Sequence, residues 1–190
     1  PDATGTLLNS DGDGSSLTSV SVAGINSSAN ADAIVISSDE EVTMPKQPGF
    51  YAWLNGDISN VTGDSTVYSI AGTWSEITDQ NADFSSGIFT APVTGTYIFY
   101  CNISISGLSA AFDVVRCYLQ TSNRNHRYYY NGFAYVTSWP IALHNGVIIA
   151  DMDASDTAQM KVCVAGGTKV IEVEGNTESQ QTNFGGWLLG

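Results

Sequence analysis

Apolar and polar side chains alternate along most of the chain after residue 48. The most regular run follows a turn rich in Pro and Gly at residues 87–95 and ends at Ser106. Every second residue of this run is apolar. The residues between them begin apolar at Ile98 and Tyr100 and then become polar. A period of two predicts a β-strand with one face in a hydrophobic core. The residues expected on that buried face are Tyr97, Phe99, Cys101, Ile103 and Ile105.

Similar runs recur at about the spacing of strands in an all-β sandwich. The last run is apolar on both faces, with Phe184 and Leu188 on one side and Trp187 and Leu189 on the other, which is typical of a central strand. No helix longer than two turns is expected. Eight or more antiparallel strands without a helical layer form two packed sheets or a barrel. The expected strands lie within residues 50–56, 65–77, 87–105, 112–120, 126–136, 146–152, 156–167 and 183–190.

The first 47 residues differ in composition from the rest. Residues 1–30 are small, polar and poor in aromatic side chains, so alone they cannot bury enough surface to fold. We interpret them as an extended linker or stalk. Residues 31–47 are expected to form a small hairpin from strands 33–37 and 41–44, which Pro45 and Pro48 end. A lone two-stranded hairpin is marginal in water, so it needs support from the domain of residues 48–190 or from neighbouring subunits.

Charge narrows the classes of partner. The chain has 6 basic and 19 acidic residues, which gives a net charge of −13. Nucleic-acid binding depends on Lys and Arg displacing counterions, so a DNA or RNA partner is not expected. An anionic membrane surface is disfavoured for the same reason. Membrane insertion is not expected either, because the chain has no apolar run of about 18 residues.

The chain has three cysteines, Cys101, Cys117 and Cys163, and all lie in apolar alternating runs. An odd number leaves two interpretations open: three buried free thiols, which we favour, or one disulfide and one thiol. Their spacings fit no zinc pattern.

The stretch GIFTAPVTGTYIF, residues 87–99, resembles the signature of C1q-like domains, roughly G-x-F-T-A-P-x-x-G-x-Y-x-F. The chain's ending resembles that family's Phe-x-Gly-Phe-Leu-Leu, with a Trp in place of the second Phe. The resemblance covers about residues 50–190 and implies a jelly-roll β-sandwich of the C1q and tumour necrosis factor (TNF) type. Pro92 would pre-set the turn and Gly95 would permit a left-handed backbone. The matched residues that we assign to core and fold are Phe89, Pro92, Gly95, Tyr97, Phe99, Phe184, Gly186, Trp187 and Leu188.

The same resemblance implies a homotrimer, in which outward apolar residues such as Trp187, Tyr118 and Tyr100 would face the threefold axis. The segment upstream resembles short repeats of bacteriophage tail-fibre and other virion proteins. We therefore interpret the chain as a non-enzymatic structural and adhesive virion protein, a fibre head or a capsid or tail decoration, whose N-terminal segment contacts other virion proteins. The alternative is a secreted or cell-surface recognition protein of lectin-like type.

A candidate contact surface for a receptor or glycan lies in residues 121–135. Arg124, His126, Arg127 and Tyr129 combine the charged, forked and aromatic groups that recognition surfaces use. Strict alternation would point Tyr128 and Tyr130 one way and Tyr129 the other. An ordinary hairpin remains the competing interpretation.

Catalysis is not expected. His126 and His144 are the two candidate bases at neutral pH, and His144 lies in the turn-like sequence LHNG. The acidic pairs 151/153 and 172/174 would suit glycoside hydrolysis, but solvated strand faces are commoner. No cofactor is expected, with the exception that Asp151, Asp153 and Asp156 offer oxygen ligands suited to Ca²⁺.

Overall fold

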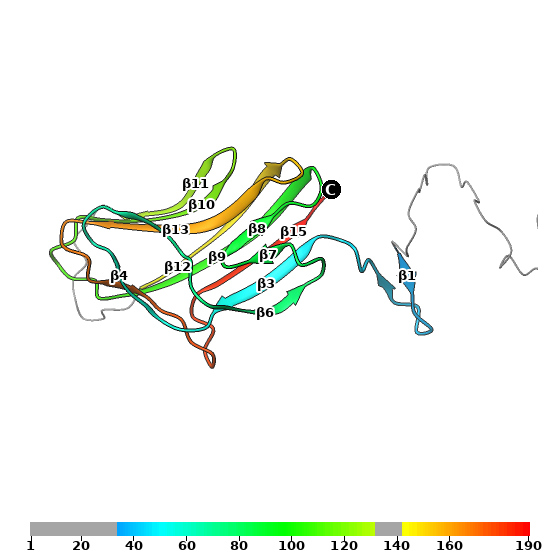
Figure 1. The fold of residues 1–190 in the computed structure, drawn as a ribbon, viewed down its shortest axis with the longest axis horizontal. Coiled ribbons are helices and arrows are strands. Elements are labelled where there is room, and N and C mark those ends of the chain that lie inside the picture. Colours follow the sequence, from blue (N-terminus) through cyan, green and yellow to red (C-terminus); the bar gives the residue numbers. More distant parts are fainter. Residues whose placement is uncertain (1–33, 132–141) are drawn as a thin grey trace, which may run out of the picture.

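A computed structural model describes residues 34–131 and 142–190. Within these ranges the chain forms fifteen β-strands (Figure 1). Among the described residues there is no helix with the length and hydrophobicity that spanning a bilayer requires. The strands are β1 (Val35–Ile36), β2 (Val42–Thr43), β3 (Gly49–Leu54), β4 (Ile58–Thr62), β5 (Val67–Ser69), β6 (Trp74–Asp79), β7 (Phe84–Ser85), β8 (Ile88–Thr90), β9 (Gly95–Ser106), β10 (Val114–Thr121), β11 (Asn125–Asn131), β12 (Ala142–Met152), β13 (Thr157–Ala165), β14 (Ile171–Val173) and β15 (Asn183–Leu188).

Two antiparallel sheets face each other and enclose the core (Figure 1). The six-stranded sheet has the order β11-β10-β13-β8-β7, and β5 also pairs with β13. The seven-stranded sheet has the order β4-β14-β9-β15-β3-β6, and β12 runs along the other edge of β9. The predicted all-β jelly-roll sandwich is therefore confirmed. The last strand is central as predicted, because β15 lies between β9 and β3.

The inner face of β9 is the one that alternation predicts. All five of its expected core side chains are fully buried. On the opposite face, Tyr100 is exposed, whereas Asn102 and Ser104 are buried. The Asn102 amide donates to the Gln181 carbonyl, so the segment before β15 covers this part of the strand. Polarity alone could not show that cover.

Phe50 is the centre of an aromatic cluster between the sheets. Its ring stacks on Phe84 and Phe89 at centroid distances of 4.7 and 4.9 Å and meets Phe184 edge-on at 4.9 Å. Phe99 contacts Phe89 and Phe184 in turn. Offset and edge-on pairs of this kind stabilise a core beyond the area that they bury. The cluster joins β3, β7, β8, β9 and β15, so it brings the first and last strands of the sandwich together with its middle strands.

The signature turn holds its shape for a different reason from the one predicted. Gly95 does not have a left-handed backbone; the glycine of this motif with positive φ is Gly87, at +83°. Gly95 is needed for space, because a Cβ there would lie 2.6 Å from the Leu188 side chain. The Tyr97 hydroxyl donates to the Val93 carbonyl at 2.8 Å and ties the turn to the strand.

The predicted hairpin is present, although the segment before it, residues 1–30, lies outside the described residues. Val35 pairs with Thr43 and Ile36 with Val42. Figure 1 shows this hairpin apart from both large sheets, and its side chains are exposed on each face. The short strands β4, β7 and β14 were not predicted. Residues 132–136, expected to continue β11, lie outside the described residues.

The interpretation of three free, buried thiols is confirmed. Cys101 and Cys117 are inward-facing and fully buried, and burial raises the pKa of both thiols. Cys163 is 1 % exposed, on the outer side of β13 beneath Arg116. The alternative with one disulfide is wrong.

His144 does not lie in a turn, as the sequence LHNG suggested, but inside β12, opposite Ile103 of β9. It is 3 % exposed, and its ring lies 3.9 Å from the Tyr129 ring. Burial lowers the pKa of His144 to about 4, from an ordinary value of 6.5. A strand that continues through Asn145 and Gly146 overrides the local turn preference, because every residue from 142 to 152 pairs with β9.

This burial makes stability depend on pH. Below pH 6.5 His144 becomes protonated in the unfolded chain but stays neutral in the native chain, so the free energy of unfolding falls as the pH falls. We expect His144 to account for a loss of about 2 kcal/mol between pH 7 and pH 5. Denaturant unfolding at pH 7 and pH 5 should show that the free energy of unfolding falls less for His144→Gln than for the unsubstituted chain. Equal losses in the two proteins would contradict the assignment.

The aromatic core also depends on a glycine in β15. A Cβ on Gly186 would lie 2.6 Å from the Phe99 ring and 2.8 Å from the Phe50 ring, both fully buried. Gly186→Ala should therefore lower the free energy of unfolding by about 1–3 kcal/mol. Gly56→Ala is the matched control, because nothing lies within 4 Å of its added methyl group, and it should change stability by less than about 0.5 kcal/mol. Equal effects of the two changes would refute the packing argument.

Candidate functional site

The outer face of the six-stranded sheet carries an unusual charge for this chain. None of its strands contains Asp or Glu, whereas they contain three of the six basic residues. These are Arg116, Arg127 and Lys161. All of the acidic residues of this chain, whose net charge is −13, lie elsewhere in the sequence. We call the outward side chains of β10, β11, β13 and β5 the cationic face.

Strand pairing brings the members of the cationic face together. Tyr118 of β10 lies opposite Arg127 of β11 on one side and Lys161 of β13 on the other. In the next row Arg116 lies opposite Tyr130. The two arginines flank that ring, with guanidinium carbons 5.7 and 4.7 Å from its centroid. Cation–π contacts at these distances attract both guanidinium groups to the ring, and the Arg116 guanidinium also donates to the Cys163 thiol at 3.9 Å.

A small hollow lies in the middle of this face. It has a volume of about 160 Å³ and is lined by Val67, Tyr118, Asn125 and Lys161. The hollow thus combines an aromatic ring, an amide, an ammonium group and a methyl-rich side chain. Such a mixture can hold the apolar face and the hydroxyl groups of a small polar ligand at once.

The tyrosines of β11 are not arranged as strict alternation predicted. Cys117 lies opposite Tyr129 and Tyr118 opposite Arg127, so Tyr128 is the extra residue of a β-bulge. Tyr129 faces inward opposite the buried Cys117, and the bulge turns Tyr128 inward as well. The two side chains pack against His144 and Gly146 of β12, respectively. Tyr130 is the outward one, 55 % exposed. The prediction that Tyr128 and Tyr130 share a face is therefore wrong, and the ring of Tyr129 packs against His144.

The other predicted contact residues lie at one end of this face. Arg124 is exposed at the hairpin tip, where its guanidinium pairs with Asp151 at 3.1 Å. His126 is half-buried and lies opposite the inward-facing Leu119. Burial and the nearby Arg124 charge lower the pKa of His126. Of the four predicted residues, Arg127 alone lies on the cationic face with its charge unopposed by a described carboxylate within 4.0 Å.

The aspartates proposed for Ca²⁺ have partners within the protein. Asp151 pairs with Arg124, and the Asp156 carboxylate accepts from the Asp153 backbone N–H at 2.9 Å and from the Asn123 amide at 2.7 Å. Ser155, with φ of +78°, supplies the left-handed residue of this turn. Among residues 34–131 and 142–190, no three acidic, His or Cys side chains stand together as a metal site. Calcium binding stays a prediction without a ligand cluster to support it.

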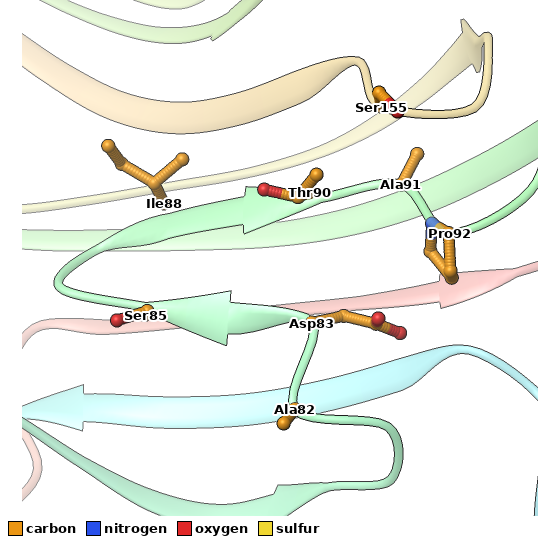
Figure 2. A pocket seen from close by; sticks show the side chains of 8 residues that line it. All are labelled: Ala82, Asp83, Ser85, Ile88, Thr90, Ala91, Pro92 and Ser155. Atoms are coloured by element: carbon orange, nitrogen blue, oxygen red, sulfur yellow. The ribbon is translucent and has the colours of Figure 1, made fainter.

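A cleft lies where the signature turn meets the turn before β13. It has a volume of about 490 Å³, and Figure 2 shows Ala91 and Pro92 between Ser155 on one side and Asp83 on the other. Asp83 is the one titratable group among its eight lining residues, and burial raises the pKa of its carboxyl. The lining of this cleft includes no base and no second acid beside Asp83, so its residues do not form a catalytic arrangement.

The outer face of the seven-stranded sheet is apolar instead of cationic. Ile149, Ile98 and Trp187 lie side by side on β12, β9 and β15. In the next row Val147 lies opposite Tyr100. We call these five residues the apolar face. The prediction that Tyr118 shares a surface with Trp187 and Tyr100 is wrong, because Tyr118 lies on β10 of the other sheet, on the cationic face.

Both outward faces were partly missed from sequence. Arg116 and Tyr118 alternate with the buried Val115, Cys117 and Leu119, so a search for polar residues between core positions would have found them. Lys161 stands in the same relation to Met160 and Val162. The pairing of β10 with β13 places Lys161 beside Tyr118, and the sequence pattern does not show which strands pair.

The sequence matches no protein-family profile and no curated protein. Solved structures do resemble the fold. The globular domain of zebrafish complement 1qA protein is similar with a TM-score of 0.50 and 16 % identity, over 76 % of this chain and 98 % of that one. Murine APRIL is similar with a TM-score of 0.51 and 11 % identity, over 76 % of this chain and 100 % of that one.

The TNF protein Eiger from S. frugiperda is similar to the same extent, with a TM-score of 0.51 and 12 % identity, over 76 % of this chain and 93 % of that one. Identities this low establish architecture and nothing finer. The chain therefore has the jelly-roll fold of C1q and TNF domains, as the turn signature and the C-terminal strand indicated.

Proposed function

We propose that this chain is a non-enzymatic recognition and adhesion module that works as a homotrimer. The apolar face carries the proposal. Val147 and Ile149 are 64 and 61 % exposed, and Trp187 and Tyr100 are 41 and 37 % exposed. Contiguous apolar surface of this kind marks an interaction site, because a lone copy would leave it in water.

The position of the apolar face favours contact between copies. It crosses three neighbouring strands, and β12 has β9 as its one pairing partner among the described strands. Leu143 extends the face along β12 and is 57 % exposed. Aromatic and branched apolar residues gathered on one sheet face can pack against an identical surface of another copy. The resemblance to C1q-like domains implies three copies, which supports a trimer over a dimer.

The cationic face is the proposed ligand surface of each copy. It lies on the opposite sheet from the apolar face, so assembly through one face leaves the other accessible. Arg and Tyr side chains on a rigid sheet provide large contact area and directed hydrogen bonds at low conformational cost. Two carboxylates, Asp151 and Asp153, line one small cleft, but Asp151 is held in an ion pair with Arg124, which does not favour an acid and base role for the pair.

A recognition module of this kind suits two biological settings. The predicted setting is a virion fibre head or decoration, held to other virion proteins by the N-terminal segment. The alternative is a secreted or cell-surface recognition protein, which is favoured by similarity to the complement 1qA globular domain. Detecting the chain in purified particles by mass spectrometry would support the first setting, and its absence from them would favour the second.

Oligomeric state tests the proposal most simply. The full chain at micromolar concentration should have a mass of three chains of 20.1 kDa by light scattering. Val147→Asp and Ile149→Asp should each shift the mass toward one chain, because both place a charge in the interface. Val170→Asp, at a 48 % exposed loop position, is the control and should keep the trimer. A stable single-chain mass for the unsubstituted protein would rule the trimer out.

A further inference from the structure

We propose that the cationic face binds an acidic oligosaccharide, with a sugar carboxylate held by Arg127, Lys161 and Arg116. This inference rests on the proposed recognition function and names its ligand class. It assigns the hollow beside Tyr118 as the place where one sugar ring sits.

Unopposed positive charge is the first argument. Among the described residues, the one ion pair with N and O within 4.0 Å is Arg124–Asp151. Arg116, Arg127 and Lys161 therefore keep their charge without a carboxylate partner there. A protein with a net charge of −13 repels anions over most of its surface. An anionic group is attracted to this face and not to its surroundings.

The geometry of the cations suits a carboxylate. Arg116 and Arg127 both lie within 6 Å of the Tyr130 ring centroid, and this contact restricts the two side chains and reduces the entropy that binding would cost. A guanidinium held in this way can donate two parallel N–H bonds to the two oxygens of a carboxylate. Lys161 lies one strand away across Tyr118 and can donate to the same ligand as a point charge.

The uncharged members of the face suit a sugar. Tyr118 and Tyr130 offer ring surface to the C–H face of a pyranose. Asn125, Gln120 and Gln159 form a cross-strand row beside them and offer amide donors and acceptors to hydroxyl groups. The hollow of about 160 Å³ has the scale of a single ring. Three positive charges in acidic surroundings favour a ligand with isolated carboxylates over a long polyanion.

Affinity of a single face is expected to be weak, because the hollow is shallow and open to water. The three copies of a trimer would raise the overall avidity, because they present three sites to one glycan-coated surface. The test therefore measures binding per site with a small, monovalent probe, so that its outcome does not depend on the trimer.

The experiment titrates the full chain with 3′-sialyllactose and with trigalacturonate, using lactose as the neutral probe, and follows binding by calorimetry. Both acidic probes, or one of them, should bind at least tenfold more tightly than lactose. The affinity should fall as salt rises from 50 to 300 mM, because the attraction is electrostatic. The probe that binds distinguishes a sialic acid from a uronic acid as the source of the carboxylate.

Variants locate the site. Arg127→Gln and Lys161→Gln should each weaken the acidic probe at least fivefold, and Lys161→Arg should retain binding because it keeps the charge. Lys169→Gln is the matched control, since it removes one positive charge away from this face, and it should bind as the unsubstituted chain does. Native mass and thermal unfolding of each variant should stay unchanged, since the substituted side chains are not in the core.

The inference would be overturned by no binding of either acidic sugar, by equal binding of lactose, or by acidic-sugar binding that Arg127→Gln and Lys161→Gln leave intact. Tighter binding of a hexaglutamate peptide than of both acidic sugars would replace the glycan with an acidic peptide and overturn it too. A trimer that binds none of the sugars would refute this inference alone. A single-chain protein that binds them would refute the trimer alone.

Discussion

The inward packing of two antiparallel sheets around Phe50 is the constraint on which the rest of the structure depends. Its ring meets aromatic side chains from β7, β8 and β15, so residues more than a hundred positions apart become neighbours. Since side chains alternate along a strand, committing one face of each sheet to this core commits the other face to the outside. The properties of the molecule then follow from what the two outer faces carry.

Those faces differ in kind. One sheet presents aromatic and branched apolar residues, and the other presents three cations and two tyrosines with no acidic residue on its strands. The acidic residues of the described part of the sandwich lie on the other sheet and on the connections, where Asp156 fixes a turn and Asp151 of β12 pairs with Arg124. A single sandwich thus separates a surface suited to self-association from a surface suited to anions. This division is why we assign assembly and ligand contact to opposite sheets.

Much of the sandwich could be predicted from sequence because its signals are local. Alternation located the long strands, and Phe184 with Trp187 marked β15 as central. The predictions that were wrong depend on contacts between strands that are distant in the sequence. A bulge at Tyr128 reversed the direction of one tyrosine, and pairing with β9 drew His144 out of a turn and into a strand. The cationic face needed the non-local pairing of β10 with β13, which one-dimensional patterns do not contain.

Solvent accessibility in the assembled protein tests this division of surfaces most directly. Hydroxyl-radical footprinting of the full chain at micromolar concentration reports the oxidation of individual aromatic side chains in one measurement. The account predicts that Trp187 and Tyr100 are protected, whereas Tyr130 reacts readily. Rapid oxidation of Trp187 together with protection of Tyr130 would contradict it, because copies would then meet through the cationic face.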